Sequence, residues 1–134
     1  MNREILFRGK RIDNREWMIG YLSSRPISIQ DGNYSPWYID VPPEHPNAKW
    51  NIGNVDPSTI GQYIGLNDNA GRKIWEGDIV EFRGDYGCIE WDNDDGRYLI
   101  SFDGWCVDFS NIWSTEVEVV GNIHDNHELI GKEE

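Results

Sequence analysis

The stretch TIGQYIGLNDNAGRKIWEGDIVEF, residues 59–82, alternates runs of β-branched and aromatic residues with two turn sequences. The runs are Thr59–Leu66, Ile74–Trp75 and Ile79–Phe82. The first turn, Asp68–Gly71, ends on a glycine that tolerates a positive φ, and the second turn is Glu76–Asp78. Because strand-forming residues and turn residues alternate throughout, the stretch predicts three short strands joined by turns.

Short strands separated by turns also dominate both sides of this stretch. Residues 4–11 and 16–22 alternate in polarity around Asp13-Asn14, so they predict an N-terminal β-hairpin. A second hairpin is predicted from Gly87–Trp91 and Arg97–Phe102, which flank the turn Asp92–Gly96. The remaining candidates are strands at 26–29, 37–41, 105–109 and 116–123 and one helical turn at 111–114. This pattern predicts a mostly β protein with few short helices.

The fold class that we predict has two parts. Residues 1–58 form the N-terminal hairpin and a loop region, in which the proline-rich segment 42–58 is a long surface loop. From Trp75 onward, a Gly-Asp turn, a strand, a glycine-led hairpin and two more strands follow in an order typical of an SH3-like barrel. Residues 59–134 are therefore predicted to be a small SH3-like barrel lobe with a C-terminal tail, packed with residues 1–58 into one compact unit.

The turn at 76–78 carries two specific predictions. Gly77 is predicted to occupy a position that requires a residue without Cβ, because the chain must reverse before Ile79. The carboxylate of Asp78 is predicted to accept a backbone N–H bond inside the turn, as aspartates often do.

The charge of the chain is strongly negative and unevenly distributed. The net charge is −12; residues 1–25 hold six basic and three acidic side chains (+3), and residues 26–134 hold six basic and 21 acidic side chains (−15). An acidic body repels phosphates, so we expect no broad binding to nucleic acid. The basic hairpin is expected to meet acidic groups of its own chain or of a neighbouring subunit.

Nothing in the sequence indicates a membrane or an exported protein. No apolar run approaches the roughly 18 to 20 residues that span a bilayer. The N-terminus, MNREILFRGKR, lacks the apolar core of a signal peptide, so we expect a cytoplasmic protein. Cys88 and Cys106, 18 residues apart with no CxxC, are expected to be reduced and buried.

No catalytic, cofactor or metal site is predicted. The acidic run Asp92–Gly96 fails the EF-hand pattern, because position 5 of the loop would be Gly96 and position 12 would be Asp103. His124 and His127 are spaced like metal ligands, but no third ligand is evident. Neither GxSxG nor GxxxxGK[ST] occurs, so the sequence favours a protein that is not an enzyme.

The seven tryptophans indicate either a dense core or a contact surface. Four lie in apolar strand patterns and are predicted to be core: Trp17, Trp75, Trp91 and Trp105. Three lie at strand ends or in loops and are predicted to be exposed: Trp37, Trp50 and Trp113.

Three stretches carry a family resemblance. They are ILFRGKRIDNREWMIGYL at 5–22, QYIGLNDNAGRKIWEGDIVEF at 62–82 and VEVVGNIHDN at 117–126. Together they resemble the YopX-like family, small proteins encoded in bacterial phages and prophages. The resemblance implies a phage or prophage origin, the host cytoplasm, a mostly β fold and homo-oligomers, and it implies no biochemical activity.

Three functional hypotheses follow. The first is a phage accessory protein without catalysis that acts through protein contacts, either by self-assembly as a homo-oligomer or by binding a host protein, including as a DNA-mimicking inhibitor. The second is a nucleic-acid-binding module of SH3-like or OB type that uses the basic hairpin and loop tryptophans. The third is an enzyme with a site that the sequence does not reveal.

Overall fold

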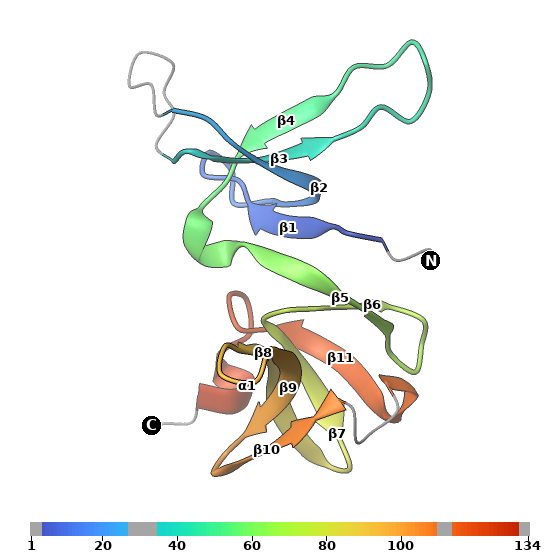
Figure 1. Cartoon of the computed structure of the whole chain (residues 1–134), viewed down its shortest axis with the longest axis vertical. Helices are drawn as coiled ribbons and strands as arrows, with labels where there is room; N and C mark the ends of the chain where they lie inside the picture. The colour runs from blue at the N-terminus through green and yellow to red at the C-terminus, as the bar shows by residue number, and fades with distance from the viewer. Residues whose placement is uncertain (1–3, 27–34, 110–113, 132–134) are drawn as a thin grey trace. The chain divides into compact units, whose positions relative to one another are not determined.

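The computed structural model describes residues 4–26, 35–109 and 114–131, and strands dominate it (Figure 1). The single α-helix of the described residues, α1 (Glu128–Gly131), is one turn long, which confirms the predicted mostly β class. The chain divides into two compact units, Met1–Gln62 and Tyr63–Glu134. The sequence placed this boundary after residue 58, and the joining of the two parts into one compact unit stays a prediction.

The N-terminal unit is built on four antiparallel strands in the order β4-β3-β2-β1. They are β1 (Phe7–Lys10), β2 (Trp17–Ser24), β3 (Trp37–Val41) and β4 (Asn51–Asn54). The hairpin β1–β2 pairs Phe7 with Gly20 and Lys10 with Trp17, as the N-terminal pattern predicted. On its other side, β1 pairs with Gly61 and Gln62, the first residues of β5 (Gly61–Asn67).

One side of this sheet carries the core of the N-terminal unit. The buried residues are Met18, Ile39 and Val55, and Phe7, Leu22, Val41 and Ile60 pack against them. The backbone comes very close at Gly20, where a Cβ atom would collide with the backbone oxygen of Asp40 on the neighbouring strand. Only glycine fits that position, so β2 and β3 can lie side by side over the core.

The prediction of a single loop over residues 42–58 was wrong, because the segment holds β4 and the 3₁₀ turn η1 (Pro57–Thr59). Asn51–Asn54 has little strand propensity of its own, but all four residues pair with β3. The Asn54 side chain fixes the register by donating to the backbone oxygens of Ser35 (2.7 Å) and Trp37 (3.0 Å). The predicted strand at 26–29 and helical turn at 111–114 fall mainly on residues outside the described ranges.

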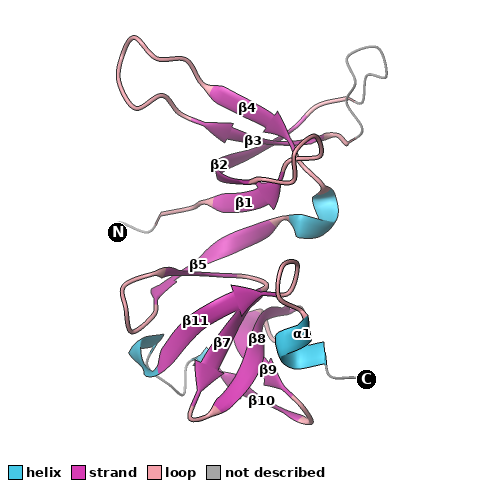
Figure 2. Cartoon of the chain, turned by 180° about the vertical axis from the view of Figure 1, so that it is seen from behind, coloured by secondary structure: helices cyan, strands magenta, loops and turns pink. Residues whose placement is uncertain are grey.

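The C-terminal unit contains a five-stranded antiparallel sheet in the order β10-β9-β8-β7-β11 (Figure 2). Its strands are β7 (Asp78–Phe82), β8 (Asp85–Asp92), β9 (Arg97–Phe102), β10 (Trp105–Asp108) and β11 (Val117–Asn122). The remainder of β5 pairs with β6 (Lys73–Trp75), and the 3₁₀ turn η3 (Ser114–Glu116) leads into β11.

The predicted strand order is present, but the sheet is not a closed barrel. Within the described residues, β10 pairs only with β9 and β11 pairs only with β7, so the two outer strands do not meet through hydrogen bonds. Local patterns specify consecutive hairpins, whereas closure requires pairing between strands that are far apart in sequence.

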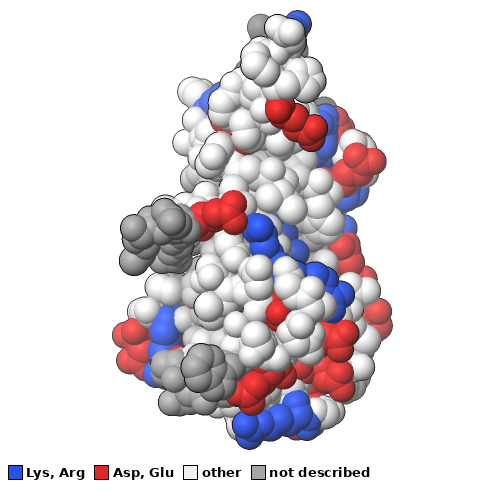
Figure 3. Space-filling view, turned by 90° about the vertical axis from the view of Figure 1, so that its right-hand side faces the viewer, with Lys and Arg blue, Asp and Glu red and all other residues white. Residues whose placement is uncertain are grey.

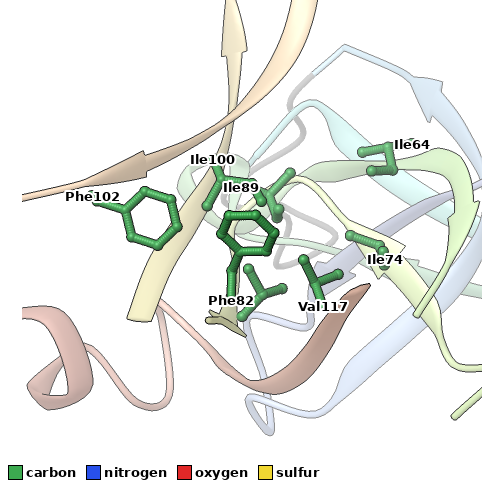
Figure 4. Packing of buried hydrophobic residues seen from close by; sticks show 8 residues of the cluster. Ile64, Ile74, Phe82, Ile89, Ile100, Phe102 and Val117 are labelled. Carbon is green, nitrogen blue, oxygen red and sulfur yellow. The ribbon is translucent and has the colours of Figure 1, made fainter. Parts of the chain in front are cut away.

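Eight buried residues form the core of the C-terminal unit, and Figure 4 shows their side chains converging from β5, β6 and the five-stranded sheet. They are Ile64, Ile74, Val80, Phe82, Ile89, Ile100, Phe102 and Val117. Gly87 lies beneath this cluster, where a Cβ atom would come within 2.6 Å of Ile100. The one-turn helix α1 lies against β8.

The turn before β7 has the predicted geometry. Gly77 has a φ of +91°, and the Trp75 N–H donates to Asp78 Oδ2 over 2.8 Å. Two backbone bonds anchor this turn, from the Gly77 N–H to Ile89 O (2.9 Å) and from the Ile123 N–H to Gly77 O (2.9 Å). The turn therefore connects β7, β8 and the end of β11.

We predict that Gly77→Val destabilises the protein by about 1–3 kcal/mol, because valine is strained at a positive φ. A Cβ atom would meet its nearest neighbour, Ile123 Cγ1, at 3.7 Å, so crowding contributes little. Gly77→Asn is the matched control, since asparagine tolerates positive φ better, and it should lose less stability. Urea unfolding measures both changes; equal stability of the valine variant and the wild type would contradict the prediction.

A second turn, at Asp68–Arg72, is organised by one buried carboxylate. Asp68 Oδ1 accepts from the backbone N–H groups of Ala70 (2.9 Å) and Arg72 (2.8 Å), and Oδ2 accepts from Val119 N–H (2.9 Å) on β11. Arg72 Nε adds an ion pair at 3.2 Å. Burial by itself raises the pKa of Asp68, but these three N–H donors and Arg72 outweigh it, and the pKa lies below its ordinary value.

We predict that Asp68→Ala costs about 2–4 kcal/mol, because it leaves buried N–H groups without an acceptor. The folded-state pKa of Asp68 is below 3.8, so its contribution is present above that pH and is lost as the pH falls through the folded-state value. Asp68→Asn should therefore remove part of the acid sensitivity. Thermal unfolding between about pH 5 and 2 tests this, and an unchanged pH profile in Asp68→Asn would refute it.

Candidate functional site

The side of the N-terminal sheet opposite its core carries several large apolar side chains that are open to solvent. Side chains alternate along β2, so Met18 is buried in the core while Ile19 and Tyr21 point the other way and are 47% and 50% exposed. Ile52 on β4 lies opposite Asp40 of β3, which itself pairs with Tyr21, so it shares this side. We call this surface the outer face; its apolar members are Trp17, Ile19, Tyr21, Trp50 and Ile52.

Aromatic rings and cations lie together on the outer face. The rings of Tyr21 and Trp50 are 6.4 Å apart between centroids, and Trp50 and Ile52 are 53% and 44% exposed. The Arg8 guanidinium lies 4.7 Å from the Trp17 ring, and Lys10 Nζ lies 5.5 Å from it. Such a surface can bind another apolar surface and can favour an acidic partner through its cations.

Of the β2 side chains on this face, the sequence assigned Trp17 to the core, whereas the structure leaves it half-buried. Trp17, Ile19 and Tyr21 share one side, because they alternate along β2. However, the opposite positions of β2, Met18 and Leu22, are apolar as well, and they are the ones that meet the core. The signal that could have revealed an exposed apolar face was this two-sided apolar pattern in β2.

Three of the basic side chains near the N-terminus form ion pairs with carboxylates of their own unit. Arg11 Nη2 lies 2.7 Å from Asp13, and Arg15 Nη1 lies 3.1 Å from Asp56. Arg25 Nη2 is 3.7 Å from Asp40. Figure 3 shows basic and acidic side chains lying next to one another on the side that faces the viewer.

The net charge therefore divides by unit. Residues 1–62 hold seven basic and seven acidic side chains, a net charge of zero, whereas residues 63–134 hold five basic and 17 acidic, a net charge of −12. The whole excess negative charge belongs to the C-terminal unit.

The tryptophans of the C-terminal unit only partly follow the prediction. Trp75 is buried, as predicted, but Trp91 and Trp105 are 43% and 47% exposed, so their assignment to the core was wrong. Each packs against another aromatic ring. Trp91 contacts Tyr98 edge-on with 4.9 Å between ring centroids, and Trp105 stacks on Phe102 with 4.1 Å between ring centroids. Both tryptophans lie on strands at the margin of the core. The alternation of side chains along a strand does not show whether another part of the chain packs over such a position.

The other predicted tryptophan positions divide in the same way. Trp17 is half-buried, while Trp37 and Trp50 are exposed as predicted. Trp113 lies outside the described residues.

Both cysteines are free, but their environments differ. Burial, assisted by the carboxylates of Glu90, Asp78 and Glu76, raises the pKa of the Cys88 thiol to about 12, so at neutral pH it is a protonated packing group. Cys106 is exposed on the outer strand β10, which corrects the prediction that it is buried.

Neither of the two metal-binding patterns considered in the sequence forms a cluster of ligands among the described residues. Asp92–Gly96 is the turn of the β8–β9 hairpin, and the side chain of Asp92 accepts the N–H of Asp94 over 3.0 Å. His124 lies in the turn after β11, and His127 immediately precedes α1. Among the residues that the structure describes, no three His, Cys, Asp or Glu side chains are grouped as metal ligands.

We predict no tight divalent-metal site. Calorimetric titration with Zn²⁺ or Ca²⁺ should show no stoichiometric binding below the micromolar range, since two His side chains and a solvated turn provide too few ligands. A His124→Ala/His127→Ala variant is the control, and stoichiometric zinc binding that this variant abolishes would reverse the conclusion.

The comparisons with known proteins agree with the fold. The family model described as YopX protein matches residues 6–131. The chain belongs to the YopX family. The crystal structure of protein EF1440 from Enterococcus faecalis is similar over 97% of this chain and 100% of that chain, with 22% sequence identity and a TM-score of 0.57. At that identity the likeness shows a shared fold and nothing about activity.

Two further findings complete the comparison. The sequence matches none of the curated proteins. In the described part of this YopX family member, no helix has the length and apolar character needed to cross a membrane.

Proposed function

We propose that this member of the YopX family is a phage or prophage accessory protein that acts in the host cytoplasm through protein–protein contacts, without catalysis. The outer face of the N-terminal sheet is its docking surface. The first partner proposed is a second copy of the chain, which makes the protein a homo-oligomer; a host protein is the other.

The exposed apolar character of the outer face carries this proposal. Four of its large side chains, Ile19, Tyr21, Trp50 and Ile52, are each more than two-fifths exposed. Tyr21 contacts the ring of Trp50, and Asp40 of β3 lies between Tyr21 on β2 and Ile52 on β4. Contiguous apolar surface of this kind on a soluble protein marks a contact site, and Trp and Tyr are enriched in such sites. Exposure of these apolar side chains to water costs about 25 cal/mol for each Å² of apolar surface, so covering them is favourable.

A nucleic-acid-binding function is the second candidate. Its supporting observation is that Trp17 lies beside two cations, Arg8 and Lys10, an arrangement that suits base stacking combined with phosphate contacts. Against it, Arg11, Arg15 and Arg25 are paired with carboxylates, and the C-terminal unit carries −12. Protein contacts are therefore the favoured function.

Light scattering over a range of micromolar concentrations tests the proposal. We expect more than one chain per particle in the wild type, and a shift to monomer in Ile19→Glu, which places a charge in the apolar face. Tyr86→Glu is the matched control, because Tyr86 on β8 is equally exposed (44%) but lies outside the outer face. Circular dichroism checks that both variants are folded.

A particle that stays monomeric at every concentration would contradict self-assembly. Salt-dependent binding of single-stranded DNA or RNA that Ile19→Glu abolishes would favour the second candidate instead.

A further inference from the structure

We propose that residues 124–131 are a detachable cover over an apolar strip of the C-terminal sheet, and that this cover opens while the sheet stays folded. The segment, which we call the terminal cover, contains the turn after β11 and the helix α1. The apolar strip consists of Ile79, Cys88 and Leu99. Both belong to the C-terminal unit, so the inference does not depend on the outer face of the N-terminal unit.

The apolar strip lies on the side of the sheet away from the main core. Side chains alternate along a strand, and each strip residue is followed directly by a core residue: Val80, Ile89 and Ile100. Cys88 pairs with Ile79 on β7, and on β9 it pairs with Ser101, two residues from Leu99. All three strip residues are nonetheless at most 9% exposed. Another part of the chain therefore covers them.

The terminal cover lies on this same side of the sheet. Gly121 of β11 pairs with Ile79, and a Cβ atom built on Gly121 would come within 2.6 Å of Asn126 Oδ1. Paired residues of an antiparallel sheet direct their Cβ atoms to the same side, so Asn126 lies on the side of Ile79. The helix α1 begins two residues later and lies against β8, the strand of Cys88 (Figures 1 and 2). The terminal cover therefore accounts for the burial of the strip.

Backbone pairing with the sheet ends where the terminal cover begins. The Ile123 N–H donates to Gly77 O over 2.9 Å, which joins the end of β11 to the turn before β7. Beyond Ile123, the backbone bonds found in the described residues stay within the segment and its attachment point: Asn126 to Asn122 (2.8 Å), Leu129 to Asn126 (2.9 Å) and Ile130 to His127 (3.2 Å). Side-chain contacts therefore hold α1 on the sheet.

These contacts are few, and α1 has little stability of its own. Helices shorter than about 12–15 residues are marginal in water, so a one-turn helix forms only while it packs on the sheet. Its two apolar side chains, Leu129 and Ile130, are partly buried, whereas His127 and Glu128 are exposed. Releasing two partly buried side chains costs much less than unfolding the core of the unit, so the opening is local.

Cys88 reports this opening chemically. Burial is the main cause that raises the pKa of its thiol to about 12, so the closed protein holds almost no Cys88 thiolate at neutral pH. Opening removes that burial, which lowers the pKa of the thiol and gives a reagent access to it. Cys106, which is exposed on β10, provides an internal reference in the same molecule.

Thiol labelling of the full-length protein tests the inference. With dithiobis-nitrobenzoate, a thiolate attacks the disulfide of the reagent, forms a mixed disulfide and releases the coloured thiolate. We expect a fast phase from Cys106 and a slow phase from Cys88, which Cys106→Ser isolates. The rate of the slow phase should change less than about twofold up to about 1 M urea, because local opening exposes little surface. A rate that rises with urea as steeply as global unfolding overturns the inference.

Substitutions in the terminal cover should release it. In the Cys106→Ser background, Leu129→Asn with Ile130→Asn should accelerate the labelling of Cys88 about tenfold or more, while circular dichroism shows that the strands remain. His127→Asn with Glu128→Gln is the matched control, because it changes two exposed positions beside them, and it should stay within about twofold of the background rate. An unchanged rate in the first variant, or loss of the whole sheet, contradicts the proposal.

Hydrogen exchange gives an independent measurement on the wild type. The amides of Leu129 and Ile130 donate within the terminal cover, so they should exchange about a hundredfold faster than the slowest amides of β7 and β8. Equal exchange rates would mean that the cover and the sheet open only together, and they would overturn the inference.

Discussion

The carboxylate of Asp68 is the interaction on which the C-terminal unit most depends. It joins the β5–β6 turn, through Ala70 and Arg72, to Val119 on β11, a strand about fifty residues later in the chain. Val117, next to that bond, is completely buried in the core with Ile64 and Ile74. A single charged group thus satisfies backbone donors from two distant segments, which holds β11 in register over the core.

The N-terminal unit is organised by a different constraint, a sheet that carries large apolar side chains on both sides. One side is covered by the unit's own core, and the other leaves Tyr21, Trp50 and Ile52 in solvent. The described residues of the unit pack their core against one side of the sheet. The uncovered side is therefore available for binding, and this availability is the physical basis of the proposed function.

Electrostatics distinguishes the two units. The basic residues near the N-terminus are balanced within residues 1–62, whereas the C-terminal unit keeps an excess of 12 negative charges. Such an excess makes the C-terminal units of two copies repel one another. The sequence showed this asymmetry, because charges can be counted without a structure, but it did not show that Arg11 and Arg15 are engaged by Asp13 and Asp56.

The sequence alone determined most of the strands and the β8–β9 hairpin. It also determined the Trp75–Asp78 hydrogen bond in the turn before β7 and the positive φ of Gly77. Each of these features depends on residues that are neighbours in the chain. The tertiary structure decided the rest. Asn51–Asn54 becomes β4 because it pairs with β3. The side of β2 that carries Met18 and Leu22 is buried because the core packs against it. The tertiary structure also left Trp91 exposed at the margin of the core. Burial and pairing between distant strands depend on what lies opposite a residue, and alternation along one strand carries no information about that.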